Sequence, residues 1–374
     1  MSFFIQRAAW QLDPLAADAP GGAMVRARAP LRVSLSGGGT DLVEYSSEHG
    51  GLVLNSTIAR YAYATLRVIE EPAIRVRSLD YDMIAHYDVD APLIYDGKFD
   101  LVKGCLRRLS VAPDPGRGIE LYLETDAPPG SGLGASSALV VAVISALSTW
   151  QKVNLTNYEI AHLAYEIERK DVGVAGGMQD QYAATFGGFN LTEFHGEDDV
   201  VVNPLRVDED ILRELEYSSL LVFTGGTRLS SRIIESQVSR YREGRDDVIA
   251  ALDRMKQLAH DAKRALLRGR ILELGEILHE GWLHKQTTSG AVTNDVIDQL
   301  YQAALRLGAV GGKMSGAGGG GFMYLVCPFD RVPAVSSGLQ DLGAEVERVR
   351  FEPHGVRSWY SNSLVRDGRI AAAV

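Results

Sequence analysis

The feature that most constrains this chain is a glycine-rich run at residues 128–138, Pro-Pro-Gly-Ser-Gly-Leu-Gly-Ala-Ser-Ser-Ala. Its three glycines alternate with other residues, and a residue without a Cβ adopts positive φ angles at little cost. Residues 119–123 alternate apolar and polar side chains, which predicts a strand before the run. Residues 135–150 are rich in Ala, Leu and Val and predict a buried helix after it. A strand, a glycine loop and a helix N-terminus favour an anion site, and we expect phosphate there.

Two other phosphate-binding loops have to be distinguished from this run. A Walker loop needs Gly-x4-Gly-Lys-Ser/Thr, and the sequence does not contain that pattern. Gly130, Gly132 and Ala135 formally fit the dinucleotide fingerprint, which also requires a second parallel strand ending in an acidic residue. Residues 154–170 instead place apolar side chains at helical spacing. The sequence therefore disfavours a dinucleotide-binding domain.

Composition limits the class of protein. The 374 residues are 46% hydrophobic and 23% charged, which is ordinary for a globular protein of one or two domains. A net charge of −10 argues against binding to nucleic acid or to an acidic membrane surface. Cys105 and Cys327 lack metal-ligand spacing and predict buried thiols in a reducing cytoplasm. There is no apolar run of 18 residues, and residues 1–23 do not resemble a secretion signal.

Strands dominate the first half of the chain and helices the second, without regular alternation, which predicts an α+β fold. We expect an N-terminal extension at residues 1–24, a first lobe at 25–190 and a second lobe at 191–374. The strands are predicted at residues 26–35, 51–58, 62–68, 74–78, 119–123, 188–191, 218–224, 322–326 and 346–352. The helices are predicted at residues 96–109, 135–150, 154–170, 230–241, 245–267, 271–286 and 294–307.

The run at 128–138 resembles the nucleotide loop of the GHMP kinases, the superfamily of galactokinase, homoserine kinase, mevalonate kinase and phosphomevalonate kinase. Residues 28–41, which end in Gly-Gly-Gly-Thr-Asp, resemble the first signature of that family, and residues 313–321 resemble the third. The first signature and residues 224–231 are most similar to the heptose-phosphate branch. The resemblance extends over roughly residues 25–360.

This resemblance implies a two-lobed fold, with an N-terminal lobe like the second domain of ribosomal protein S5 and a ferredoxin-like C-terminal lobe. ATP would lie between the lobes. Mg²⁺ would lie between Ser136 and Glu168, with Ser137 as the alternative hydroxyl ligand. The residues expected to hold the nucleotide are Pro129, Gly130, Ser131, Gly132, Leu133, Gly134, Ala135, Ser136 and Ser137.

The resemblance also implies the reaction. Asp180 would accept the proton of the sugar's anomeric hydroxyl or only align it, and Arg32 would be a second catalytic residue. The implied product is a heptose 1,7-bisphosphate made from D-glycero-D-manno-heptose 7-phosphate. Arg228 is the first choice for holding the sugar's phosphate. The residues expected to bind the substrate are Gly38, Gly39, Thr40, Asp41, Gly177, Arg228, Arg28, Ser315 and Gly316.

Other interpretations stay open at this point. Glu168 and Asp180 could be unrelated surface carboxylates, and Lys170 and Lys285 are expected on solvated helix faces although each could meet phosphate. Another GHMP kinase, acting on fucose or a related hexose, is the nearest functional alternative. A non-catalytic regulator and an NAD-dependent oxidoreductase are more distant ones. We expect no nucleic-acid or membrane partner, and the sequence leaves the oligomeric state open, with a homodimer as one option.

Overall fold

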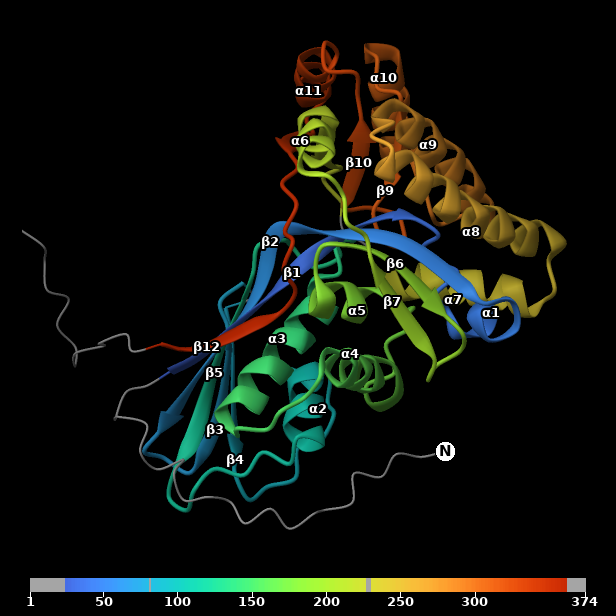
Figure 1. Cartoon of the computed structure of the whole chain (residues 1–374). Helices are drawn as coiled ribbons and strands as arrows, with labels where there is room; N and C mark the ends of the chain where they lie inside the picture. The colour runs from blue at the N-terminus through green and yellow to red at the C-terminus, as the bar shows by residue number, and fades with distance from the viewer. Residues whose placement is uncertain (1–23, 81, 227–229, 362–374) are drawn as a thin grey trace, which may run out of the picture.

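The computed structural model describes residues 24–80, 82–226 and 230–361. Its larger sheet has the strand order β12-β1-β2-β5-β3-β4, and β6 and β7 extend it beside β2 (Figure 1). Every pairing in it is antiparallel except that of β3 with β5. Its strands are β1 (Met24–Ser36), β2 (Gly51–Ile69), β3 (Ala73–Ser78), β4 (Met83–Asp88), β5 (Gly118–Thr125), β6 (Phe189–Phe194), β7 (Val200–Pro204) and β12 (Arg357–Ser361).

A second, four-stranded antiparallel sheet lies above the first in Figure 1. Its order is β11-β8-β10-β9, and α9 packs against β9 and β10. The two separate sheets with helices beside them confirm the predicted α+β class. The strands of this sheet are β8 (Ser219–Phe223), β9 (Gly311–Met314), β10 (Phe322–Val326) and β11 (Glu345–Arg348).

The predicted helices are present with shifts at some of their ends, and the structure adds helices at residues 43–49, 179–186, 209–218 and 332–341 that the sequence did not predict. The helix after the glycine loop has the predicted bounds, and it packs across β1 and β2 with most of its residues buried. A second helix and a π-helical turn (Ile167–Asp171) follow it, so the strand that a dinucleotide domain requires is absent from this described stretch. The helices are α1 (Val43–His49), α2 (Asp100–Arg108), α3 (Ala135–Trp150), α4 (Asn157–Glu166), α5 (Gln179–Phe186), α6 (Glu209–Ser218), α7 (Ser230–Arg242), α8 (Asp246–Leu267), α9 (Ile271–Thr288), α10 (Asp295–Leu307) and α11 (Val332–Asp341).

One long strand, β2, replaces the two strands predicted at 51–58 and 62–68. Pro30 of β1 lies opposite Tyr61, but the next residue of β1 lies opposite Ile58, so β2 bulges between these positions. Because the ladder resumes after the bulge, the strand continues instead of turning. The first half of β2 pairs with β6 and the second half with β5.

The chain returns to the first sheet after it has built the second. β6 and β7, which precede the second sheet, pair beside β2, and β12 follows it and pairs with β1. The sequence did not predict β4, β7, β9 or β12. The strand predicted at 346–352 ends at Arg348. β6, which extends past residue 190, still belongs to the first sheet. The lobe boundary near residue 190 stays a prediction.

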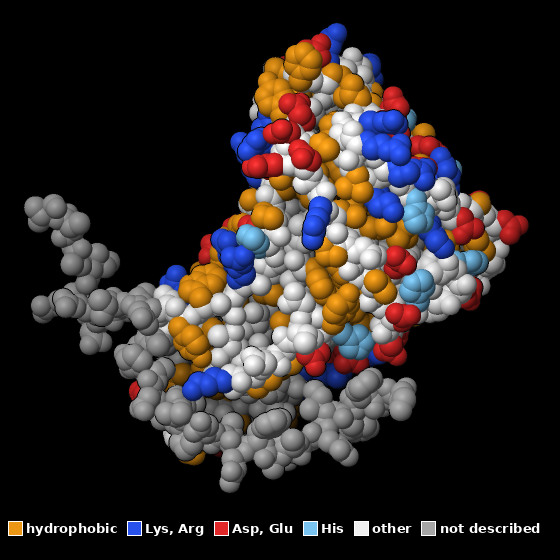
Figure 2. Space-filling model, in the orientation of Figure 1, with side chains coloured by type: hydrophobic (Ala, Val, Ile, Leu, Met, Phe, Trp, Pro, Cys, Tyr) orange, Lys and Arg blue, Asp and Glu red, His pale blue; other side chains and the backbone are white. Residues whose placement is uncertain are grey.

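The described residues test the expectations drawn from composition. The thiols Cys105 and Cys327 are both buried and free, as predicted. None of the described helices combines the length and the hydropathy needed to cross a membrane. On the face shown in Figure 2, Lys and Arg side chains are interspersed with Asp and Glu.

The glycine loop joins the two sheets through backbone contacts. Arg32 of β1 donates its N–H to Leu133 O at 2.9 Å, and Phe322 of β10 donates its N–H to Ser131 O, also at 2.9 Å. Gly321 adopts a φ of +86°, and a Cβ at this position would overlap Ser131 O. The third glycine signature thus packs directly against the glycine loop of the first sheet.

This contact predicts a difference in stability between alanine variants at two glycines with nearly equal φ angles. Gly343 has a φ of +87° with open space around it, so Gly343→Ala should cost about 1–2 kcal/mol of unfolding free energy. Gly321→Ala should cost roughly 1–3 kcal/mol more, because the added methyl group forces the backbones apart. Urea unfolding of both variants measures the difference. Equal losses would show that the joint between the sheets tolerates a side chain.

Candidate active site

A cavity of about 640 Å³ opens beside the glycine loop. The start of α5, the loop between β1 and α1, and residues of α7 and α9 line its other sides. Gly130, Gly132 and Gly134 adopt φ angles of +70°, +75° and +75°, which confirms the predicted role of the alternating glycines. Gly134 caps α3, so the free N–H groups of the first turn of α3 and the positive end of its dipole lie at this cavity.

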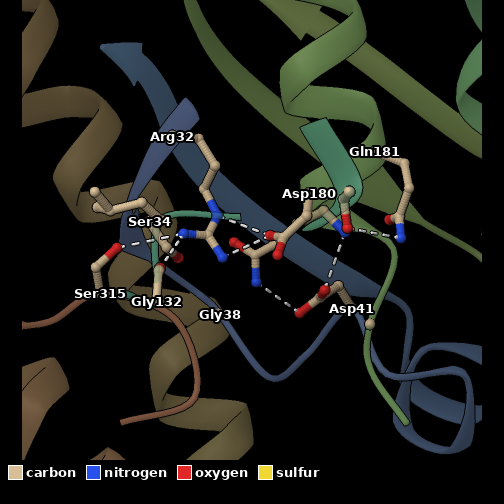
Figure 3. A network of polar contacts seen from close by, with 12 residues as sticks. Arg32, Ser34, Gly38, Asp41, Gly132, Asp180, Gln181 and Ser315 are labelled. Atoms are coloured by element: carbon tan, nitrogen blue, oxygen red, sulfur yellow. Dashed lines mark hydrogen bonds and ion pairs between the residues drawn. The ribbon is translucent and has the colours of Figure 1, made fainter. Parts of the chain in front are cut away.

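Arg32 lies at the centre of the site (Figure 3). Its side chain is only 4% exposed and contacts the carboxylate of Asp180 with two nitrogens, each at 2.7 Å from Oδ1. Its Nη1 also donates to Gly132 O at 2.5 Å and to Ser315 Oγ at 3.3 Å. Asp180 keeps 21% of its side chain exposed and lines the cavity. The ion pair therefore fixes the orientation of a carboxylate that a substrate can still reach.

Three consecutive residues at the start of α5 contact three different parts of the site. Gln179 donates its backbone N–H to Asp41 at 3.1 Å, and Asp180 binds Arg32. Gln181 donates to Ser137 Oγ at 3.2 Å and also to Glu168. Successive side chains of a helix point about 100° apart, so one helical turn can serve all three directions.

Glu168 is fully buried on the π-helical turn, and it accepts hydrogen bonds from two of the loop's three serines. Ser136 Oγ donates to it at 3.1 Å and Ser137 Oγ at 2.6 Å. Both serines line the cavity, but Ser137 is buried whereas Ser136 is exposed. The alternative that Glu168 and Asp180 are unrelated surface carboxylates is wrong.

A magnesium ion fits this donor set through a few protein ligands. No group of three acidic, histidine or cysteine side chains suited to a metal occurs within the described ranges. Mg²⁺ is commonly held by one or two carboxylates, with water and phosphate oxygens filling its octahedron. Ser136 lines the cavity, and the buried carboxylate of Glu168 lies directly behind its hydroxyl, so the two provide such a partial set.

The loop expected to hold the substrate surrounds Asp41. This carboxylate is 2% exposed and accepts from the N–H of Gly39 at 2.9 Å and from Gln179 Nε2 at 3.2 Å. Gly39 and Asp41 line the cavity, and a Cβ at Gly38 would lie 2.8 Å from Ser34 Oγ. Thr40 is fully buried and bonds to backbone groups, donating to Gly37 O at 2.8 Å. Thr40 thus holds the loop in place, and its neighbours face the cavity.

The remaining predicted substrate residues fall into three groups. Gly177 and Gly316 line the cavity, and Ser315 is buried behind it against Arg32. Arg28 is not among the lining residues; its guanidinium lies 4.5 Å from the centre of the Tyr61 ring. Arg228 lies outside the described residues.

Lys285 corrects one expectation from the sequence. It was predicted on a solvated helix face, but it is buried, lines the cavity and donates to Gly38 O at 3.3 Å. Burial lowers its pKa to about 8, and the charge of Asp41 partly opposes this effect. Lys170, by contrast, is 39% exposed and pairs with Glu197 at 2.9 Å, as expected for a surface lysine.

Two further cations near the site were missed by the sequence analysis. Lys313 is buried and donates to Ser34 O at 2.8 Å, and burial holds its pKa well below the ordinary value. Arg169 donates to Gly177 O at 3.1 and 3.2 Å and so braces the glycine turn before α5. Lys313 bonds to a backbone carbonyl far away in the sequence, and Arg169 bonds to one in a turn. Such contacts cannot be predicted from a sequence pattern.

Comparison with known proteins identifies the family of this chain. The family "GHMP kinases N terminal domain" matches residues 100–188, and "GHMP kinases C terminal" matches residues 262–345. The chain is 40% identical over 337 residues to the D-glycero-alpha-D-manno-heptose 7-phosphate kinase of Campylobacter jejuni, covering 90% of this chain and 98% of that one. The chain belongs to the GHMP kinase family. The predicted family, and with it the predicted class of small-molecule kinase, is confirmed.

Solved structures agree with this membership. A D-glycero-D-manno-heptose 1-phosphate kinase from Bacteriodes thetaiotaomicron superposes with a TM-score of 0.75 at 38% identity, covering 90% of this chain and 98% of the other. The galactokinase of Lactococcus lactis superposes with a TM-score of 0.68 at 20% identity, which shows the shared fold alone. Membership of the GHMP kinase family excludes the NAD-dependent oxidoreductase considered above.

The buried ammonium of Lys285 predicts a rise of stability with pH. An unfolded lysine titrates near 10.5 and this one near 8, so between these values the unfolded chain binds more protons than the folded chain. The unfolding free energy of the wild type, relative to that of Lys285→Met, should therefore increase over this range, by up to about 1.4 kcal/mol per pH unit.

Urea unfolding of both proteins at pH 7.5 and pH 10 measures this difference. Lys170→Met is the control, because a partly exposed lysine with a raised pKa contributes no such rise below pH 10. If the difference in unfolding free energy between wild type and Lys285→Met stays constant with pH, Lys285 is not destabilised by burial of its charge.

Proposed function

We propose that this chain transfers the γ-phosphoryl group of ATP to the anomeric hydroxyl of D-glycero-D-manno-heptose 7-phosphate, giving the 1,7-bisphosphate. The observation that carries the proposal is that Asp180, held by Arg32, faces the same cavity as the glycine loop and Asp41. A phosphate donor on one side and a polyol on the other would meet at this carboxylate. The 40% identity to a heptose 7-phosphate kinase supports the choice of sugar.

The residues suggest a simple sequence of events. The backbone N–H groups of residues 130–137 and the dipole of α3 would hold the phosphates of ATP. Asp180 would accept or align the proton of the anomeric hydroxyl while the oxygen of that hydroxyl bonds to the γ-phosphorus. The bond from that phosphorus to the β–γ bridging oxygen breaks, and ADP leaves with the electron pair. Arg32 keeps Asp180 aimed at the hydroxyl throughout.

Ser136 and Glu168 are the residues that would hold Mg²⁺. When bound, the ion neutralises charge that develops on the phosphate oxygens. Both serines line the cavity, and Ser136 is the proposed hydroxyl ligand because it is exposed whereas Ser137 is 1% exposed. We also propose a cytoplasmic location for the chain, since its donor ATP is found there.

A second substrate class is supported by other relatives. The chain is 29% identical to the bifunctional fucokinase/GDP-fucose pyrophosphorylase of Arabidopsis thaliana, over 79% of this chain and 29% of that protein. The names of the heptose-kinase relatives also differ, one specifying the 7-phosphate and one the 1-phosphate. An ATP-consumption assay should therefore include heptose 7-phosphate, heptose 1-phosphate, L-fucose and hexose phosphates. Phosphorus NMR then locates the new phosphate, and turnover of fucose alone would replace the heptose proposal.

Asp180→Asn should lower kcat by about 10²–10⁴-fold, because the amide cannot accept the proton of the hydroxyl. The KM for ATP should change little, since Asp180 does not lie among the backbone donors of the loop. Asp41→Asn is the matched comparison, and its main effect should be on the KM for the sugar. Activity of Asp180→Asn within a few-fold of wild type would remove Asp180 from the catalytic role.

Glu168→Gln should raise the half-saturating magnesium concentration by roughly tenfold or more, because one of two protein ligands loses its charge. The amide keeps a shape that can still bond to Ser136 and Ser137, so thermal stability serves as the check on folding. Glu166→Gln is the control, since Glu166 pairs with Arg108 at 3.3 Å, whereas Glu168 bonds to Ser136 and Ser137. An unchanged magnesium response in Glu168→Gln would exclude the proposed ion site.

A further inference from the structure

The helix α7 borders the sugar side of the cavity and lies between the two segments that match the family. Ile234 and Gln237 both line the cavity, and their spacing of three residues places them on one helical face. Two contacts fix α7 on α1: Tyr241 donates to Glu48 at 2.7 Å, and Arg242 donates to Glu44 at 2.8 Å. The position of Gln237 is therefore set by packing between α7 and α1.

Two buried amides at this wall have polar atoms without partners. Gln237 is 4% exposed and Gln179 is 8% exposed. Among the described residues, Gln237 Nε2 and Gln179 Oε1 make no hydrogen bond. Leaving a buried polar group unpaired costs about 1–3 kcal/mol, so such groups in a cavity wall point to a ligand that pairs with them.

Both amides lie against the glycines that precede Asp41. A Cβ at Gly39 would lie 2.9 Å from Gln237 Nε2, and one at Gly38 would lie 3.3 Å from Gln179 Nε2. The glycines let the two amides approach the loop closely. Gln237 from α7 and Gln179 from α5 thus face the same short stretch of backbone from different elements.

Lys285 completes this wall from α9. Within the described structure its Nζ donates one hydrogen bond, to Gly38 O, although an ammonium group has three donors. The neighbouring carboxylate Asp41 offsets its positive charge. The wall therefore combines donors and acceptors and has little net charge.

We propose that Gln237 and Lys285, with Gln179 and Asp41, form a subsite for two adjacent neutral hydroxyl groups of the acceptor sugar. Each hydroxyl both donates and accepts, which matches an amide N–H and an ammonium set beside an amide oxygen and a carboxylate. A phosphate dianion would face the carboxylate of Asp41, so the phosphate of the acceptor binds elsewhere. Gln237 is thus a specificity-determining residue, and this assignment rests on the sugar-kinase function proposed above.

The test is steady-state kinetics of the full chain with heptose 7-phosphate and its 2-, 3- and 4-deoxy analogues. Gln237→Ala should raise the KM for the sugar roughly tenfold while the KM for ATP stays within about twofold. For the one analogue that lacks the hydroxyl bound by Gln237, variant and wild type should share the same KM. Glu235→Ala is the control, because Glu235 lies exposed on α7 two residues away.

The outcomes separate this proposal from the proposed function. Wild type that turns over no heptose phosphate contradicts the function, and calorimetric titration of free mannose and fucose into wild type and Gln237→Ala then tests the subsite alone. Normal wild-type turnover with an unchanged sugar KM in Gln237→Ala overturns the subsite. An equal rise in KM for every analogue, or for sugar and ATP alike, overturns it too. Thermal melting of Gln237→Ala and of Gln237→Asn identifies any loss due to folding.

Discussion

The site depends on one buried cation, Arg32. Its guanidinium group bonds at the same time to the carboxylate of Asp180, the carbonyl of Gly132 and the hydroxyl of Ser315. A buried charge is costly unless it is paired and its donors are satisfied, and the planar fork of an arginine can meet several acceptors at once. The glycine loop, the start of α5 and the third glycine segment must therefore lie in fixed positions around Arg32. The cavity for a phosphoryl donor and its acceptor exists because these three segments meet.

The two ends of the cavity use different chemistry. At the glycine loop the available donors are backbone N–H groups and a helix dipole, which recognise phosphate whatever molecule carries it. At the opposite end the donors and acceptors are the side chains of Asp41, Gln237 and Lys285. Side chains can change without altering the backbone, so acceptor choice can vary on a constant nucleotide loop. Relatives named as heptose, fucose and mevalonate kinases fit this division.

A local irregularity gives Glu168 its position. The chain leaves α4 through a π-helical turn at 167–171, and such turns often occur at functional sites because they redirect side chains. Here the turn buries Glu168 beneath Ser136 and Ser137, where Gln181 also reaches it. The carboxylate is thereby held beside the first turn of α3. A phosphate on the loop and an ion on Glu168 would be neighbours.

The features that depend on neighbouring residues could be predicted from the sequence. Alternating glycines predicted the positive φ angles of the loop, and the apolar run at 135–150 predicted α3 with its observed bounds, because both depend on nearby residues. The motifs also indicated the family and brought Asp180, Glu168 and Asp41 forward as candidates. Only the tertiary structure decided which charged groups are buried together. Arg32 and Asp180 are 148 residues apart, and Lys285 reaches Gly38 from 247 residues away. A lysine on a helix resembles a solvated one until the fold buries it against the loop that follows β1.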